Sequence, residues 1–247
     1  MKGPTISFED NSKVSISENL SDGGEKKVDN NIPFRVCWWN GGGAIRNRIC
    51  VNPGLDSLLK TNPDLFVYGE SACSNARGLF LSGYRFLFHR AYIKDKQKSR
   101  RGLVIFYKDK YHNLISKAYS SKKFDIVWIK LATKSKQLYF CFFYAPGTHC
   151  SEEVRIHFYK ILSDSYMKFA EKGDIYLLGD ANARLGTFTK DLNIHGNPVT
   201  NKNKPLFMGF TEYCGLTLLN KIFAKGIPTY QIPKLERSII DMGITNS

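Results

Sequence analysis

The sequence predicts an α/β protein in which two packed mixed β-sheets are flanked by helices. Short runs rich in aromatic and β-branched residues recur from Pro33 onward, and glycine, proline, asparagine or lysine-rich turns separate them. Segments with helical periodicity are fewer, and they do not alternate strictly with the strands as in a doubly wound parallel fold. Because no internal repeat or second linker interrupts the pattern, we expect one domain over residues 33–247.

Nine segments are expected to form strands, since each is short, apolar and bounded by turn residues. In chain order they are residues 34–40, 64–70, 84–92, 102–109, 125–133, 137–146, 174–182, 216–220 and 238–245.

Three segments are expected to form helices. Residues 52–62 begin with the start signal Asn-Pro, and residues 205–215 form a shorter candidate. Residues 151–173 have Ser151 as N-cap, acidic residues in the first turn and Gly173 as the stop. Apolar residues recur at helical spacing in this long segment and predict one stripe facing the core: Val154, Phe158, Ile161, Leu162, Phe169 and Ala170.

Charge is distributed unevenly along the chain. The formal net charge is +14, but residues 1–31 hold four Lys and six Asp or Glu, so this segment is −2 and the remaining 216 residues carry +16. We expect residues 1–32 to be a disordered polar leader, and they lack the apolar core of a secretory signal. A basic folded body favours an anionic partner, nucleic acid first and an anionic membrane second; a merely soluble basic surface is the alternative. No apolar run approaches the roughly 18 residues of a membrane span.

Two basic segments are candidates for contacts with a phosphate backbone. Residues 89–102, HRAYIKDKQKSRRG, carry six Lys or Arg, which suits binding through counterion release. A solvated charge run at a hairpin tip explains this segment equally well. The segment GGGAIRNR contains Arg46 and Arg48, and it is not a nucleotide-binding loop because no Gly-Lys-Ser/Thr follows.

Polar residues end three otherwise apolar strands: Asn40, Glu70, and Asp180 with Asn182. One such site alone is more often a turn, so the combination carries the argument. Mg²⁺ takes oxygen ligands and is commonly held by one or two carboxylates plus substrate phosphate, which suits Asn40 and Glu70. Phosphodiester hydrolysis also needs an activated water and donors for the growing charge, and Asp180, Asn182 and Tyr144 are of suitable types.

An ordered series of motifs resembles the endonuclease/exonuclease/phosphatase superfamily, and in particular the apurinic-type endonuclease domain of non-LTR (LINE-like) retrotransposons. The series is WWN (38–40), PDLFVYGE (63–70), FYAP (143–146), LLGDANARLG (177–186), PTY (228–230) and RSIID (237–241), and the similarity runs from residue 34 to 247. The resemblance implies a deoxyribonuclease-like four-layer α/β sandwich. It also implies a Mg²⁺-dependent endonuclease, with Mn²⁺ as the alternative metal, that nicks DNA and leaves a 3′-hydroxyl as primer for reverse transcription.

The resemblance implies a role for each matching position. Glu70 would be the principal Mg²⁺ ligand with Asn40 beside it. Tyr144 would contact the scissile phosphate, Asp180 would orient or deprotonate the attacking water, and Asn182 would stabilise the developing charge. Thr229 and Ser238 would line the DNA groove. The other candidate DNA-binding residues do not rest on the resemblance: Arg46, Arg48, Arg100, Arg101 and Arg184.

Asp241 would orient a catalytic histidine, much as the acid of a Ser-His-Asp triad does. The family's Ser-Asp-His motif would follow it, but all five histidines of the chain precede Asp241. Either the chain is a fragment whose last strand and a downstream reverse transcriptase are missing, or it is a decayed copy. We favour truncation because the other motif positions are occupied by suitable residues. Gly42 also stands where relatives often have a polar residue, which predicts weaker metal binding.

The expected function is therefore a Mg²⁺-dependent DNA endonuclease of a retrotransposon-type protein, with DNA as partner and an intracellular, nuclear location. Two alternatives stay open: a catalytically impaired nucleic-acid-binding module on the same fold, and a phosphatase of the same superfamily.

Overall fold

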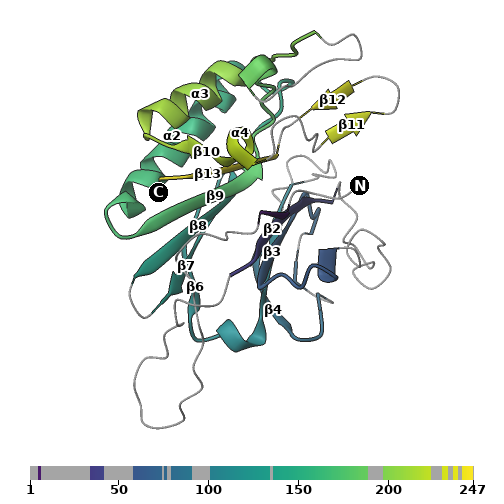
Figure 1. Cartoon of the computed structure of the whole chain (residues 1–247), viewed down its shortest axis with the longest axis vertical. Coiled ribbons are helices and arrows are strands. Elements are labelled where there is room, and N and C mark those ends of the chain that lie inside the picture. Colours follow the sequence, from purple (N-terminus) through teal and green to yellow (C-terminus); the bar gives the residue numbers. More distant parts are fainter. Residues whose placement is uncertain are drawn as a thin grey trace. The chain divides into compact units, whose positions relative to one another are not determined.

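The structure is a computed structural model. It describes residues 5–6, 34–41, 58–73, 75–76, 79–90, 101–133, 136–188, 197–223, 230–232, 236–238 and 241–246. The chain divides into two compact units, residues 1–120 with 127–140, and residues 121–126 with 141–247. Two mixed β-sheets with flanking helices confirm the predicted fold class (Figure 1). The expectation of one domain stays a prediction.

The first sheet has the strand order β1-β2-β3-β5-β4. Strands β2 and β3 are parallel, and the other neighbours are antiparallel. The rings of Phe66 in β3 and Phe106 in β5 stack 4.8 Å apart at its core. The bounds are β1 Thr5–Ile6, β2 Val36–Asn40, β3 Leu65–Gly69, β4 Tyr84–His89 and β5 Leu103–Lys108.

Strand β1 belongs to the segment predicted as a disordered leader. It pairs antiparallel with β2, with Thr5 opposite Cys37 and Ile6 opposite Val36. The other residues of that segment lie outside the described ones, so its disorder stays a prediction.

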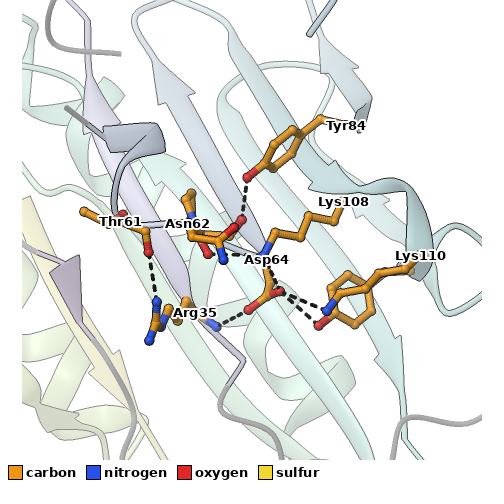
Figure 2. A network of polar contacts seen from close by, with 9 residues as sticks. Arg35, Thr61, Asn62, Asp64, Tyr84, Lys108 and Lys110 are labelled. Carbon is orange, nitrogen blue, oxygen red and sulfur yellow. Dashed lines mark hydrogen bonds and ion pairs between the residues drawn. The ribbon is translucent and has the colours of Figure 1, made fainter. Parts of the chain in front are cut away.

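A buried carboxylate anchors the amino end of β3. Asp64 is 5% exposed and accepts hydrogen bonds from Lys108 Nζ (3.0 Å) and the Arg35 backbone N–H (3.0 Å) (Figure 2). It also accepts one from the Tyr111 hydroxyl (3.1 Å). Tyr111 lies in the 3₁₀ helix η2 (Asp109–Tyr111), directly after β5. A buried carboxylate is costly without hydrogen-bond donors, so Asp64 needs all of these partners. The hydrogen bonds join the start of β3 to the last residue of β5 and to the residue before β2. The opposite end of β3 leads to Glu70.

The second sheet has the order β10-β13-β9-β8-β7-β6. Its bounds are β6 Ile115–Ser120, β7 Asp125–Ala132, β8 Gln137–Tyr144, β9 Asp174–Asp180, β10 Thr217–Leu218 and β13 Asp241–Thr245. Strands β11 (Tyr230–Ile232) and β12 (Glu236–Ser238) form a separate antiparallel pair.

The helices are α2 (Glu152–Ala170), α3 (Lys204–Tyr213) and α4 (Leu219–Phe223), with the 3₁₀ helix η3 (Gly186–Phe188) after β9. Helices α2 and α3 lie side by side (Figure 1). No helix within the described ranges is long and apolar enough to cross a membrane.

The inward face of α2 differs from the predicted stripe. Phe158, Leu162 and Phe169 are buried as expected, but Val154 is 37% exposed. The buried positions recur three and four residues apart from Arg155 onward: Arg155, Phe158, Tyr159, Leu162, Ser165, Tyr166 and Phe169. Val154 lies one position outside this stripe, and a charged residue takes its place.

Some expected elements differ in extent or type. Residues 216–220 were expected to form a strand, but only Thr217–Leu218 do so before α4 begins at Leu219. The strand expected over 238–245 is instead the end of β12 followed by β13, which begins at Asp241. Strand β6 was not predicted. Of the helix expected over 52–62, Leu58 and Leu59 are helical, and the earlier part lies outside the described residues.

Candidate active site

Two carboxylates meet at one end of the ladder between β9 and β13. Asp180 is the last residue of β9, Asp241 is the first of β13, and the two are register partners. Both residues are buried, at 2% and 8% exposure. Side chains directly opposite each other in an antiparallel pair share one face, with Cβ atoms about 4.5–5.5 Å apart. Two acids predicted from separate motifs are therefore neighbours.

Gly179 lets β9 approach β8 closely beside this pair. A Cβ added at Gly179 would lie 2.0 Å from the backbone oxygen of Phe143, so no other residue fits without moving the strand. The N–H of Ala145 then donates to the carbonyl of Asp180 (2.8 Å). Tyr144 ends β8 between these two contacts and is partly exposed. The Gly-Asp sequence thus places Tyr144 next to the Asp180 strand end.

Asn182 is held in a tight turn after β9. Its φ is 46°, in the left-handed region. Its backbone N–H donates to Asp180 Oδ1 (2.7 Å), and its side-chain Nδ2 donates to the carbonyl of Ala145 (2.8 Å). The first bond is an Asx-type contact that makes this turn tolerable for a non-glycine residue. The two polar residues of the motif therefore fix each other's positions.

Asn220, which the sequence did not single out, supports Asp241. It lies in α4 and is 2% exposed. Its Nδ2 donates to the carbonyl of Asp241 (3.0 Å), and its Oδ1 accepts from the N–H of Gly243 (2.6 Å). Strand β10 pairs only with Ile244 and Thr245, so the Asn220 amide takes over the hydrogen bonding of β13 where β10 stops.

Asn40 and Glu70 belong to the other unit, at the carboxyl ends of neighbouring parallel strands. Asn40 is the register partner of Gly69, and the N–H of Gly41 donates to the carbonyl of Gly69 (3.1 Å). Glu70 follows at once with φ 50°. This conformation ends the in-out alternation of the strand, so the direction of the Glu70 side chain is set by the turn and not by the pleat. Both residues are partly exposed.

The turn after Glu70 is pinned to the entry of β5. The N–H groups of Ser71 and Ala72 donate to the carbonyls of Gly102 and Arg101, both at 3.0 Å. The backbone of Arg101, a predicted DNA contact, is therefore bonded to the turn that follows the predicted metal ligand.

Backbone strain marks the same positions independently. Among the described residues, the non-glycine residues with positive φ are Asn62, Glu70, Ala72 and Asn182. This conformation is uncommon for residues with a side chain, and such strain concentrates at functional sites. Two of the four were singled out from the sequence on chemical grounds alone.

The donors of Asn40 and Glu70 fit a hard divalent cation only in part. An amide and a carboxylate oxygen are ligand types that Mg²⁺ accepts, and Mg²⁺ usually keeps several waters. In the ranges that the structure describes, no group of three or more His, Cys, Asp or Glu side chains could hold a metal ion. The donor chemistry is thus compatible with Mg²⁺ and does not identify it.

Comparison with known proteins bears on the fold. No family model matches the chain, and no curated protein matches it. Among solved structures it is similar to the endonuclease domain of TRAS1, a telomere-specific non-LTR retrotransposon, at 16% identity and a TM-score of 0.59 over 86% of this chain and 84% of that one. It is also similar to the AP endonuclease LMAP of Leishmania major, at 14% identity and a TM-score of 0.65 over 85% of this chain and 78% of that one. A third similar structure is the 3′ phosphatase NExo of Neisseria, bound to product DNA hairpin, at 15% identity and a TM-score of 0.60 over 85% of each chain.

The chain has the fold of the endonuclease/exonuclease/phosphatase superfamily. The resemblance predicted from the motifs is confirmed at this level.

Four residues predicted to be catalytic lie together at the end of β9: Tyr144, Asp180, Asn182 and Asp241. Arg184 lies in the same segment, and its N–H donates to Asn201 Oδ1 (3.2 Å). Of the other predicted DNA contacts, Arg46, Arg48, Arg100 and Thr229 lie outside the described residues, and Ser238 is described only as the last residue of β12. The predicted roles of all these residues stay predictions.

Proposed function

We propose that the chain is a Mg²⁺-dependent phosphodiesterase that nicks DNA, of the type found in retrotransposon proteins. The observation that carries this proposal is the juxtaposition of Asp180, Asn182 and Asp241 at the end of β9. It occurs on a fold shared with an endonuclease domain and an AP endonuclease.

The residues of the Asp180 strand end act on water and phosphate. Asp180 accepts a proton from, or orients, the attacking water, which requires a fixed carboxylate. The hydrogen bond from the Asn182 N–H to Asp180 Oδ1 (2.7 Å) supplies that fixation. Tyr144 and the Asn182 amide donate to phosphate oxygens, whose charge grows in the transition state. The role that the resemblance gives Asp241 is to orient a protonated histidine, which assists the leaving oxygen.

Glu70 and Asn40 hold the metal. Bound Mg²⁺ supplies Lewis-acid stabilisation of phosphate charge. The turn at Glu70 sets the direction in which its side chain leaves the backbone, and the bond of Ala72 to Arg101 (3.0 Å) keeps that turn in place.

DNA is the proposed partner because the chain is strongly basic, with a formal charge of +14. Charge of this sign supplies sequence-tolerant affinity for a phosphate backbone. The likeness to a retrotransposon endonuclease domain supports a role in priming reverse transcription, with a downstream reverse transcriptase as partner and a nuclear location.

Two alternative functions are a phosphatase and a nucleic-acid-binding module without catalytic activity. A phosphatase is favoured by the likeness to a 3′ phosphatase. A binding module without chemistry would need only the basic character of the chain, whose formal charge is +14.

The test is nicking of supercoiled plasmid in the presence of Mg²⁺ or EDTA. Glu70→Gln removes the metal-binding charge, and Glu171→Gln makes the same change at an exposed residue after α2. We expect nicking by the unaltered protein and by Glu171→Gln, with none in EDTA and almost none with Glu70→Gln. The 3′ end of the nick should be a hydroxyl that a polymerase extends.

Each alternative has its own result. Release of phosphate from a 3′-phosphorylated oligonucleotide without plasmid nicking supports the phosphatase. Salt-sensitive DNA binding with neither product supports the binding module. Full nicking by Glu70→Gln would overturn the assignment of the metal ligand.

A further inference from the structure

Arg155 is a buried arginine in the inward stripe of α2. It is 5% exposed, and its Nη1 donates to the carbonyl of Lys202 (2.9 Å) and to Asn203 Oδ1 (3.2 Å). Its Nε has no hydrogen-bond partner within the described structure. A guanidinium is always charged, and burying a charge with incomplete hydrogen bonding is costly. A leucine or methionine would fill the same stripe without this cost, so packing alone does not account for Arg155.

The segment that Arg155 holds carries two asparagines. Asn203 is fully buried, and its Nδ2 donates to the carbonyls of Asn182 (3.0 Å) and Pro146 (2.9 Å). Nδ2 of Asn201 donates to the same Asn182 carbonyl (2.8 Å). The Oδ1 atom of Asn201 accepts from the N–H groups of Arg184 (3.2 Å) and Asn203 (3.1 Å). Two amide donors from one short segment therefore converge on the carbonyl of Asn182.

This convergence completes the restraint of Asn182. Its N–H is bound to Asp180 and its side-chain Nδ2 to Ala145, and its carbonyl is bound from the other side. The left-handed φ of 46° is a conformation that a free asparagine adopts only part of the time. The direction of the Asn182 side chain thus depends on contacts whose far end is Arg155.

The guanidinium also lies within electrostatic range of the same strand end. Tyr159, one turn after Arg155, donates its hydroxyl hydrogen to the carbonyl of Ala181 (3.2 Å). Burial raises the pKa of Tyr159 well above its ordinary value, the charge of Asp180 raises it further, and the charge of Arg155 lowers it. The pKa of the Tyr159 hydroxyl therefore responds to the charges of both Asp180 and Arg155.

We propose that Arg155 is a positioning residue for the turn Asp180–Asn182, acting through Asn203 and Asn201 on the carbonyl of Asn182. The effect on rate rests on the proposed function, because the position of Asn182 matters for catalysis only if this strand end performs phosphodiester hydrolysis. The effect on structure does not depend on that function.

The first experiment measures amide hydrogen exchange by NMR, without any substrate. Arg155→Lys keeps the charge and removes Nη1, the atom that donates to both acceptors. We expect exchange of the Asn182 N–H to become roughly tenfold faster or more, while that of Leu177 in the middle of β9 is unchanged. Asn203→Asp keeps the acceptor for Arg155, removes the donor to Asn182, and should give the same result. Arg85→Lys, at an exposed ion pair with Asp109, is the matched control.

The second experiment measures nicking kinetics. Arg155→Lys and Asn203→Asp should each lower kcat by roughly 10- to 100-fold with little change in KM, since a small misplacement of a catalytic group is enough. The double variant should be no slower than the more impaired single one, because both act on one contact.

The outcomes separate this inference from the proposed function. Equal acceleration of exchange at Leu177 and Asn182 would show a general loss of stability and overturn the inference, as would unchanged exchange at Asn182. Fully additive losses in kcat would overturn the pathway through Asn203. If the unaltered protein does not nick DNA, the proposed function fails, and the exchange experiment still decides the inference.

Discussion

Asp241 stands directly opposite Asp180 at the end of the β9–β13 ladder, and both residues are almost fully buried. Like charges at directly opposite positions of a sheet are destabilising. A fold that keeps two acids in this relationship accepts that cost, which is typical of a functional site. The pair is thus the part of the molecule where stability and function should respond in opposite directions.

Asp241→Asn should separate these two effects. Replacing one of the two facing acids by an amide removes like-charge repulsion between them, so we expect the free energy of unfolding in urea to rise. The rate of nicking should fall at the same time. Asp174→Asn changes an acid at the other end of β9 and serves as control. A variant that loses stability and keeps its full rate would contradict the role assigned to Asp241.

Gly179→Ala should damage the site through the backbone. The added Cβ would meet the Phe143 carbonyl oxygen at 2.0 Å, and a backbone atom in a strand cannot move away cheaply. We expect a loss of roughly 1–3 kcal/mol or more, measured by urea unfolding. Gly209→Ala is the matched control, since it lies in α3 with no atom within 4 Å of the added Cβ. That change should stabilise the protein by about 0.5–1 kcal/mol. Similar effects of both changes would refute the close approach of β9 and β8.

Asn220→Ala should loosen the start of β13. It leaves the buried carbonyl of Asp241 and the N–H of Gly243 without their side-chain partner, at a cost of about 1–3 kcal/mol for each group. Exchange of the Gly243 N–H should become faster than that of Leu177. Ile222→Ala changes an exposed residue of the same helix and should cost only a few tenths of a kcal/mol. Unchanged Gly243 exchange in Asn220→Ala would be evidence against this support.

Tyr84 should titrate late and link stability to alkaline pH. Burial raises its pKa from 10.0 to about 12, with smaller contributions from the charges of Asp64 and Cys37. Because the folded state holds this proton more tightly than the unfolded state, the stabilisation is complete below pH 10 and is lost as the pH rises towards 12. The ring-proton NMR shifts of Tyr84 during an alkaline titration measure this pKa, because absorbance would sum all 13 tyrosines of the chain.

The control for this titration removes one cause. Asp64→Asn should lower the pKa of Tyr84, whereas Asp109→Asn, at an exposed ion pair, should leave it nearly unchanged. A Tyr84 that titrates at its ordinary value in the unaltered protein would show that this end of β3 is more open than described.

The sequence predicted those features that leave a local signal. Strands such as β3 and β5 are continuous apolar runs between turn residues, and they were found. Strand β6 was missed because its sequence ISKAYS is mostly exposed and carries no strong apolar pattern. Leu219 and Asn220 looked like the end of a strand, but they begin α4, from which Asn220 contacts β13.

The site shows the same division. Asn40, Glu70 and Asp180 were found because each ends an apolar run with a polar residue. Asn220 and Asn203 act through hydrogen bonds to residues 21 positions away along the chain, and Arg155 through one that spans 48. No pattern in the neighbouring sequence predicts contacts between residues this far apart in the chain. The burial of Arg155 even contradicts the pattern, since Val154 was the apolar residue expected to face inward.

The most direct measurement compares Asp180→Asn with Asp174→Asn in single-turnover cleavage of a supercoiled plasmid with Mg²⁺. Both changes replace an acid by its amide in the same strand, one at the candidate site and one at the opposite end. Asp180→Asn should lower the rate by a factor on the order of 10²–10⁴ while leaving DNA affinity unchanged, and Asp174→Asn should match the unaltered protein. Equal rates for the two variants would show that hydrolysis, if present, takes place elsewhere on the chain.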